Sequence, residues 1–179
     1  MKYFAYGSNM FSFHFRDCAR KAQVIGLGKL LGYQLRFHKR SMDGSAKCDA
    51  FKTGSQEDLV YGVIYEIELE QERRKLDRKE GLGCGYNKND VDVETDEGAS
   101  TVFTYLADSS AIDDTLKPYT WYKDFVVYGA KEHGLPEGYV EKIESVEADL
   151  DPDEERHGEN HQVLLDGLEE LNKKADPEQ

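Results

Sequence analysis

Strand-forming segments dominate the chain up to Leu106, and only one helical segment interrupts them. The run Leu59–Ile67 is rich in β-branched and aromatic residues, which is typical of a strand. Further strands are predicted over residues 2–6, 22–30, 31–38, 89–94 and 101–106. An alternating βαβ fold requires a helix between successive strands. The order of elements therefore favours an α+β fold, a small mixed β-barrel with surrounding helices.

Composition and capping residues place the helices. Residues 68–79 are strong helix formers with acidic residues first and basic residues later, as the helix dipole favours. Residues 119–132 form a second predicted helix, which stops before Gly134, and a third helix begins at Pro136. Most of the helical sequence thus follows the last strand.

The composition changes after Ala148. Asp149–Glu159 is acidic and almost free of apolar residues, which is typical of a linker or tail. Residues 163–171 predict one short amphipathic helix. The sequence therefore predicts one folded domain over residues 1–148 and an acidic C-terminal tail with a short helix over residues 149–179.

Two polar segments lead to further predictions, one about a loop and one about a metal site. The segment His38–Lys47 predicts a mobile loop. His157 and His161 lie four positions apart, a spacing that suits a metal only on a helix. Gly158 and the acidic surroundings argue against a helix there, so no metal site is expected.

The overall charge limits the class of partner. The 179 residues carry 23 Lys and Arg against 36 Asp and Glu, a formal net charge of −13. Nucleic acid and anionic membranes would be repelled on average, so neither is an expected partner. No apolar run approaches the length of a membrane span, and no apolar signal region follows Met1. We therefore expect a cytoplasmic protein, in which Cys18, Cys48 and Cys84 are free thiols.

The segment Tyr3–Met10 is the first candidate for function. It is a short predicted strand that runs directly into the turn Tyr6-Gly7-Ser8-Asn9. Successive backbone N–H groups in such a turn can point at one centre and hold a small anion. An ordinary turn is the simpler interpretation of this segment taken alone.

Glu80 is the second candidate. It lies in the last turn of the helix predicted over residues 68–79, where the helix dipole is negative. That position, and burial in addition, should raise the pKa of its carboxyl group and suit it to accept and return a proton. Gly81, Gly83 and Gly85 follow and leave room for a ligand. They do not form a dinucleotide fingerprint, because the βαβ context is missing.

Three segments together resemble a known family. Tyr3–Met10, Leu76–Gly81 and Tyr122–Pro136 follow one another in the order and at the spacing of the γ-glutamylcyclotransferases. The resemblance extends from residue 3 to about residue 147 and does not cover the tail. Three separated motifs in order are far more specific than any one of them.

The resemblance implies an intramolecular acyl transfer. The free α-amine of a γ-glutamyl amino acid would attack its own γ-carbonyl, close the ring of 5-oxoproline and release the amino acid. Glu80 would be the general acid and base, and no metal or cofactor would take part. The substrate is then expected to contact Tyr6, Gly7, Ser8, Asn9, Tyr86 and Tyr122.

Two departures from the family pattern accompany this expectation. The loop before Tyr86 is shorter than in relatives, and Pro118-Tyr119 stands where Pro-Ser is common. The resemblance also suggests a homodimer. Two alternatives stay open: the same chemistry on γ-glutamyl amines or glutathione, and a domain that binds small acids without catalysis.

Overall fold

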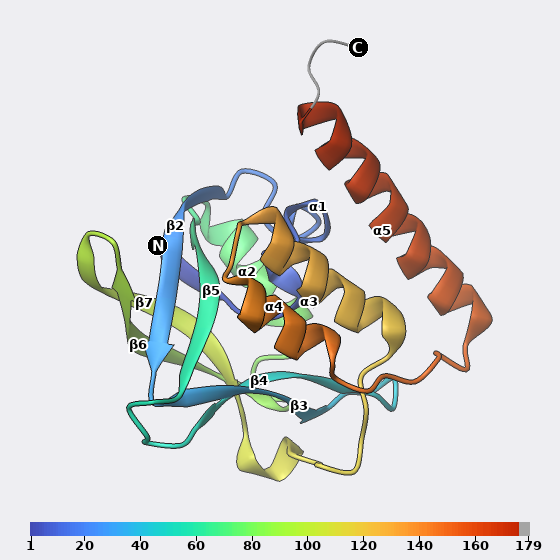
Figure 1. Cartoon of the computed structure of the whole chain (residues 1–179), viewed down its shortest axis with the longest axis horizontal. Coiled ribbons are helices and arrows are strands. Elements are labelled where there is room, and N and C mark those ends of the chain that lie inside the picture. Colours follow the sequence, from blue (N-terminus) through green and yellow to red (C-terminus); the bar gives the residue numbers. More distant parts are fainter. Residues whose placement is uncertain (176–179) are drawn as a thin grey trace.

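The computed structural model describes residues 1–175, and a closed five-stranded barrel forms its centre (Figure 1). Neighbouring strands around the barrel are β1 (Lys2–Ala5), β5 (Leu59–Glu66), β2 (Gln23–Leu31), β6 (Tyr86–Thr95) and β7 (Gly98–Ala107). The β1–β7 pair is parallel and the other pairs are antiparallel. The prediction of a mixed β-barrel with surrounding helices is confirmed.

The β6–β7 hairpin carries one wall of the barrel. Its register pairs Thr95 with Gly98 across the two-residue turn and Tyr86 with Ala107 at the far end. Gly98 has a φ of +111°, which glycine adopts without the steric cost of a side chain. The strands predicted over residues 89–94 and 101–106 are confirmed, and both run a few residues beyond the predicted limits.

A second, two-stranded sheet lies beside the barrel and consists of β3 (Tyr33–Arg40) and β4 (Ala46–Lys52). The predicted loop His38–Lys47 is too long, because β3 extends to Arg40 and β4 begins at Ala46, which leaves residues 41–45 as the connection. The reason is pairing of the polar groups. The buried His38 ring lies 3.1 Å from the Asp49 carboxylate and 2.9 Å from that of Asp114.

The α-helices gather on one side of the barrel, with α5 outermost (Figure 1). The longer ones are α2 (Glu70–Lys79), α3 (Thr120–Glu132), α4 (Glu137–Glu144) and α5 (Glu154–Ala175), and the short ones are η1 (Ser8–Met10), α1 (Ser12–Phe15) and η2 (Ser109–Ala111). No helix within residues 1–175 combines the length and apolar composition that a membrane crossing requires.

The C-terminal segment differs from the prediction. The helix α5 has 22 residues and begins at Glu154, so it includes much of the segment that was expected to be a linker. Gly158 does not interrupt it, and the rings of His157 and His161 stack on its surface. Tertiary contact explains the difference, because Gly167 lies directly against Phe11. The division of the chain at residue 148 stays a prediction.

Close packing of α3 against η1 fixes the N-terminal loop. A Cβ atom at Gly129 of α3 would lie 2.4 Å from the backbone nitrogen of Phe11. Only glycine permits this approach. Phe11 and Phe125 are fully buried beneath the loop. The turn that follows β1 is therefore held between the barrel and α3.

Candidate functional site

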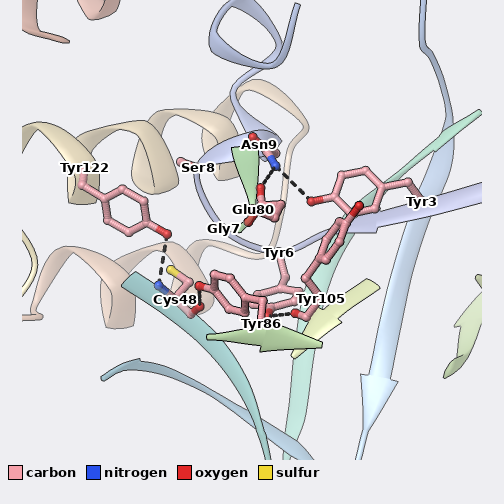
Figure 2. Close-up of a pocket in the computed structure, with 10 residues that line it drawn as sticks. All are labelled: Tyr3, Tyr6, Gly7, Ser8, Asn9, Cys48, Glu80, Tyr86, Tyr105 and Tyr122. Atoms are coloured by element: carbon pink, nitrogen blue, oxygen red, sulfur yellow. Dashed lines mark hydrogen bonds between the residues drawn. The ribbon is translucent and has the colours of Figure 1, made fainter. Parts of the chain in front are cut away.

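A small cavity opens where β1 ends (Figure 2). Five tyrosines, one thiol and one carboxylate surround it. Its lining comprises Tyr3, Tyr6, Gly7, Ser8, Asn9, Cys48, Glu80, Tyr86, Tyr105 and Tyr122. All seven site residues predicted from the sequence are among these ten, so the fold brings them to one place. Tyr3, Cys48 and Tyr105 were not predicted.

The turn Gly7-Ser8-Asn9 presents backbone donors to this cavity. The carbonyls of Gly7 and Ser8 accept hydrogen bonds from Met10 and Phe11 at 3.0 and 3.1 Å. The N–H groups of Gly7, Ser8 and Asn9 have no acceptor among the described residues. Three successive free donors at one wall are suited to an anionic or carbonyl oxygen.

Gly7 keeps this wall open. A Cβ atom at position 7 would lie 3.2 Å from the Cβ of Cys48 and 3.3 Å from the Tyr122 hydroxyl. A side chain at this position would therefore press against Cys48 and Tyr122 and narrow the cavity.

Glu80 lies beside this turn and forms a second wall of the cavity. Its backbone N–H donates to Leu76 at 2.9 Å, so Glu80 completes the last turn of α2, as predicted. Gly81 then adopts a φ of +62°, which ends the helix and turns the chain away. Burial raises the pKa of the Glu80 carboxyl group. Asn9 is the one hydrogen-bond partner found for this carboxylate among the described residues, so the carboxylate has acceptor capacity left for a bound ligand.

Asn9 joins the two walls. Its Nδ2 donates to Glu80 Oε1 at 2.7 Å and to the Tyr3 hydroxyl at 3.0 Å. The bond to Glu80 favours the charged carboxylate and partly offsets the effect of burial on its pKa. The Oδ1 atom of Asn9 is buried and has no hydrogen-bond partner within residues 1–175. Asn9 therefore orients the carboxylate and keeps one acceptor free.

Cys48 holds two of the tyrosines in place (Figure 2). Its backbone N–H donates to the Tyr122 hydroxyl at 3.0 Å, and its carbonyl accepts a hydrogen bond from the Tyr86 hydroxyl. Burial raises the pKa of the Cys48 thiol to about 12. The thiol is therefore neutral, and Cys48 contributes its backbone rather than a nucleophile.

Two further tyrosines connect the cavity to the barrel. The Tyr6 hydroxyl donates to the carbonyl of Tyr105, and the Tyr105 hydroxyl donates to Asp77 Oδ1 at 2.6 Å. Burial raises the pKa of the Tyr6 phenol well above its ordinary value, as it does for Tyr86 and Tyr122. These phenols stay protonated and act as neutral donors.

Three lining residues were not predicted, and they differ in how strong a signal the sequence carried for each. Tyr3 lies inside the N-terminal motif, and Tyr105 follows Phe103 with the two-residue spacing of one strand face. Cys48 had no signal, because no strand was predicted over residues 46–52. Among the described residues, no three His, Cys, Asp or Glu side chains gather as a metal site would require.

Comparison with known proteins gives consistent matches. The model of the AIG2-like family matches residues 59–143. The γ-glutamylcyclotransferase of Homo sapiens is 32% identical over 152 residues, which is 81% of this chain and 78% of the human protein. The enzyme of the same name from Mus musculus is 32% identical over 155 residues, with the same coverage.

A solved structure supports the same similarity. A structure described as a γ-glutamyl cyclotransferase superposes with a TM-score of 0.77 at 26% identity. The match covers 92% of this chain and 98% of that one.

Proposed function

The chain belongs to the γ-glutamylcyclotransferase family, and we propose that it cyclises the γ-glutamyl group of γ-glutamyl amino acids to 5-oxoproline. The carrying observation is the 2.7 Å hydrogen bond between Asn9 and Glu80, which joins a wall of free backbone donors to a buried carboxylate. The backbone donors bind oxygen atoms of the substrate, and the carboxylate transfers a proton.

The donor wall accounts for substrate binding. In this proposal, the N–H groups of Gly7, Ser8 and Asn9 bind oxygen atoms of the glutamyl group, including its α-carboxylate. Charge-assisted hydrogen bonds of this kind are the stronger ones. Binding through the carboxylate leaves the α-amine free to face Glu80.

Glu80 accounts for proton transfer. The α-amine is protonated in solution and must lose a proton before it can attack. Glu80 accepts that proton, the amine nitrogen bonds to the γ-carbon, and the carbon–nitrogen bond to the amino acid breaks. Glu80 returns the proton to the departing nitrogen, and the extra proton that the ring nitrogen carries after the attack passes to the released amine, which leaves as an ammonium ion. A carboxylate whose pKa is raised by burial accepts a proton more readily than an ordinary carboxylate, and its protonated form can return that proton to the departing nitrogen.

The shape of the cavity supports the ring closure. The nucleophile and the carbonyl belong to one molecule, so the protein only has to hold a folded conformer. The rings of Tyr86 and Tyr122 line the cavity, and both hydroxyls are fixed by Cys48. A rigid aromatic wall favours the compact conformer of the substrate over its extended conformer.

The proposal also names a substrate class. We propose γ-glutamyl amino acids as the physiological substrates, with γ-glutamyl amines and glutathione as the alternatives. The cytoplasmic location and the homodimer remain predictions.

A substitution at Glu80 tests the proposal. Glu80→Gln keeps the size of the side chain and a hydrogen-bonding partner for Asn9 but removes the base. We expect 5-oxoproline release from γ-glutamyl-alanine to fall about 100- to 10,000-fold, with ligand binding retained. Glu141→Gln, on the exposed face of α4, is the matched control and should keep wild-type turnover.

The outcomes separate the hypotheses. Equal turnover in wild type and Glu80→Gln would exclude Glu80 as the base. Binding without turnover in both proteins would favour the non-catalytic alternative. A panel that includes glutathione and a γ-glutamyl amine assigns the leaving group.

A further inference from the structure

Lys39 is a buried cation beside the site that the reaction described above does not use. The residue is only 8% exposed, although lysine is almost never buried unless it is paired. Among the described residues, no carboxylate lies within ion-pair distance of its ammonium, and no hydrogen bond from it is found. The neighbouring Lys47, by contrast, pairs with Asp43 at 2.7 Å. An unpaired buried charge is costly, so its retention calls for an explanation.

The fold directs Lys39 toward the segment that follows Glu80. Its ammonium lies 4.5 Å from the centre of the Tyr86 ring, and Tyr86 lines the cavity. The strand register shifts between Phe37 and Lys39, an irregularity of the kind that re-aims a side chain near functional sites. Lys39 therefore reaches the aromatic wall of the cavity from the β3 side.

Gly85 makes the space that Lys39 occupies. A Cβ atom at Gly85 would lie 2.9 Å from Lys39 Cε and 3.3 Å from its Nζ. Gly85 also has a φ of +123°, which other residues rarely adopt. The loop before Tyr86 is thus shaped around the lysine side chain.

Lys39 and Glu80 also act on each other electrostatically. The Glu80 carboxylate raises the pKa of Lys39, against the larger lowering effect of burial. In turn, Lys39 lowers the pKa of Glu80. The other charged or ionisable groups that influence Lys39 are Asp43 and Cys84, and no positive group is among them. The positive field of Lys39 therefore reaches the carboxylate that handles the proton of the departing nitrogen.

We propose that Lys39 is a specificity-determining residue whose ammonium binds the carboxylate of the departing amino acid. This inference rests on the proposed function. The turn Gly7-Ser8-Asn9 takes the glutamyl end, and Glu80 serves the nitrogen at which the substrate is cleaved. The group on that nitrogen then extends past Tyr86, where Lys39 supplies the missing counter-charge. The preferred substrate class is γ-glutamyl amino acids with a free carboxylate, rather than γ-glutamyl amines.

Two substrates that differ in one carboxylate test the proposal. γ-Glutamyl-alanine and γ-glutamyl-ethylamide have the same leaving nitrogen and the same two carbons, and only the first carries the carboxylate. Lys39→Met keeps an apolar stem against Gly85 and Tyr86 without the charge, and Lys39→Arg keeps the charge. Lys52→Met, an exposed lysine on β4, is the matched control.

We expect Lys39→Met to raise the KM for γ-glutamyl-alanine at least tenfold, with kcat changed much less. Turnover of γ-glutamyl-ethylamide should change less than threefold, and Lys39→Arg should recover part of the preference. Equal losses on both substrates would overturn the proposal and leave Lys39 as a support for Tyr86.

Failure of the proposed function would look different. In that case the wild-type protein releases 5-oxoproline from neither substrate. Calorimetric binding measurements then test whether Lys39 binds the carboxylate. Tighter binding of γ-glutamyl-alanine than of the ethylamide, lost in Lys39→Met, would support the carboxylate site. No such difference, or no binding of either compound to wild type, would overturn it.

Discussion

Asn9 is the residue on which the site geometry depends most. It belongs to the donor turn through its backbone and to the proton-transfer wall through its side chain. Buried and hydrogen-bonded on its Nδ2, it has little freedom to move. Replacement of Asn9 therefore probes how the two walls are coupled.

Removal of the Asn9 amide should move the acidic limb of the activity profile to higher pH. The amide lowers the pKa of Glu80 by stabilising its charged form, so Asn9→Ala raises that pKa. A higher pKa leaves less carboxylate at a given pH, and the rate begins to fall sooner as the pH drops. Profiles of kcat against pH for wild type and Asn9→Ala measure the shift.

Asn87→Ala, on the exposed part of β6, serves as the control for this prediction. Its profile should coincide with that of wild type. If the acidic limb of the Asn9→Ala activity profile stays in place or moves to lower pH, the Asn9 amide does not lower the pKa of Glu80.

At the scale of elements, α5 makes a close contact with the rest of the fold at Gly167. A Cβ atom at Gly167 would lie 2.4 Å from Phe11 Cζ and 2.9 Å from the Cβ of Phe13. The segment before α5 is tied down as well, because Trp121 Nε1 donates to Asp151 at 2.9 Å. Arg156 then pairs with Asp151 and fixes the first turn of the helix.

Gly167→Leu should destabilise the protein by about 2 kcal/mol, because the new side chain cannot fit without displacing Phe11 or the helix. Urea unfolding followed by circular dichroism measures the change as a lower midpoint. Gly158→Ala lies on the same helix with nothing within 4 Å of the added atom. This control should raise the midpoint, since alanine favours a helix over glycine by about 1 kcal/mol.

A Gly167→Leu midpoint equal to that of wild type would show that the contact between α5 and Phe11 does not contribute to stability.

At the scale of the whole molecule, the net charge of −13 opposes compactness. Salt screens repulsion between exposed carboxylates over about 10 Å at 0.1 M ionic strength. The urea midpoint should therefore rise when KCl increases from about 20 to about 200 mM. A midpoint that falls over this range would mean that surface ion pairs outweigh the repulsion.

Ligand binding should respond to salt in the opposite sense. The proposed contact between Lys39 and a substrate carboxylate is an ion pair at the cavity, and screening weakens such attraction. Stability and affinity are thus affected by different charges of the same molecule.

The sequence by itself determined the elements that carry the two walls of the cavity, and the chemistry of the residues in them. Alternation in the β6–β7 hairpin and the composition of α2 are local signals, because strands and helices depend on residues a few positions apart. The position of Glu80 at the end of α2 and the turn at Gly7 followed from the same local rules. The motifs around them also sufficed to predict the family.

Only the tertiary structure decided which residues meet. Asn9 and Glu80 are 71 positions apart, and their hydrogen bond depends on how β1 and α2 pack. Polar Lys39 and His38 indicated a loop, but the fold buries both beside groups distant in the chain. The helix α5 likewise extends through an acidic segment because Phe11 offers a surface for Gly167. Contacts of this kind arise from packing between elements, which no local pattern of residues specifies.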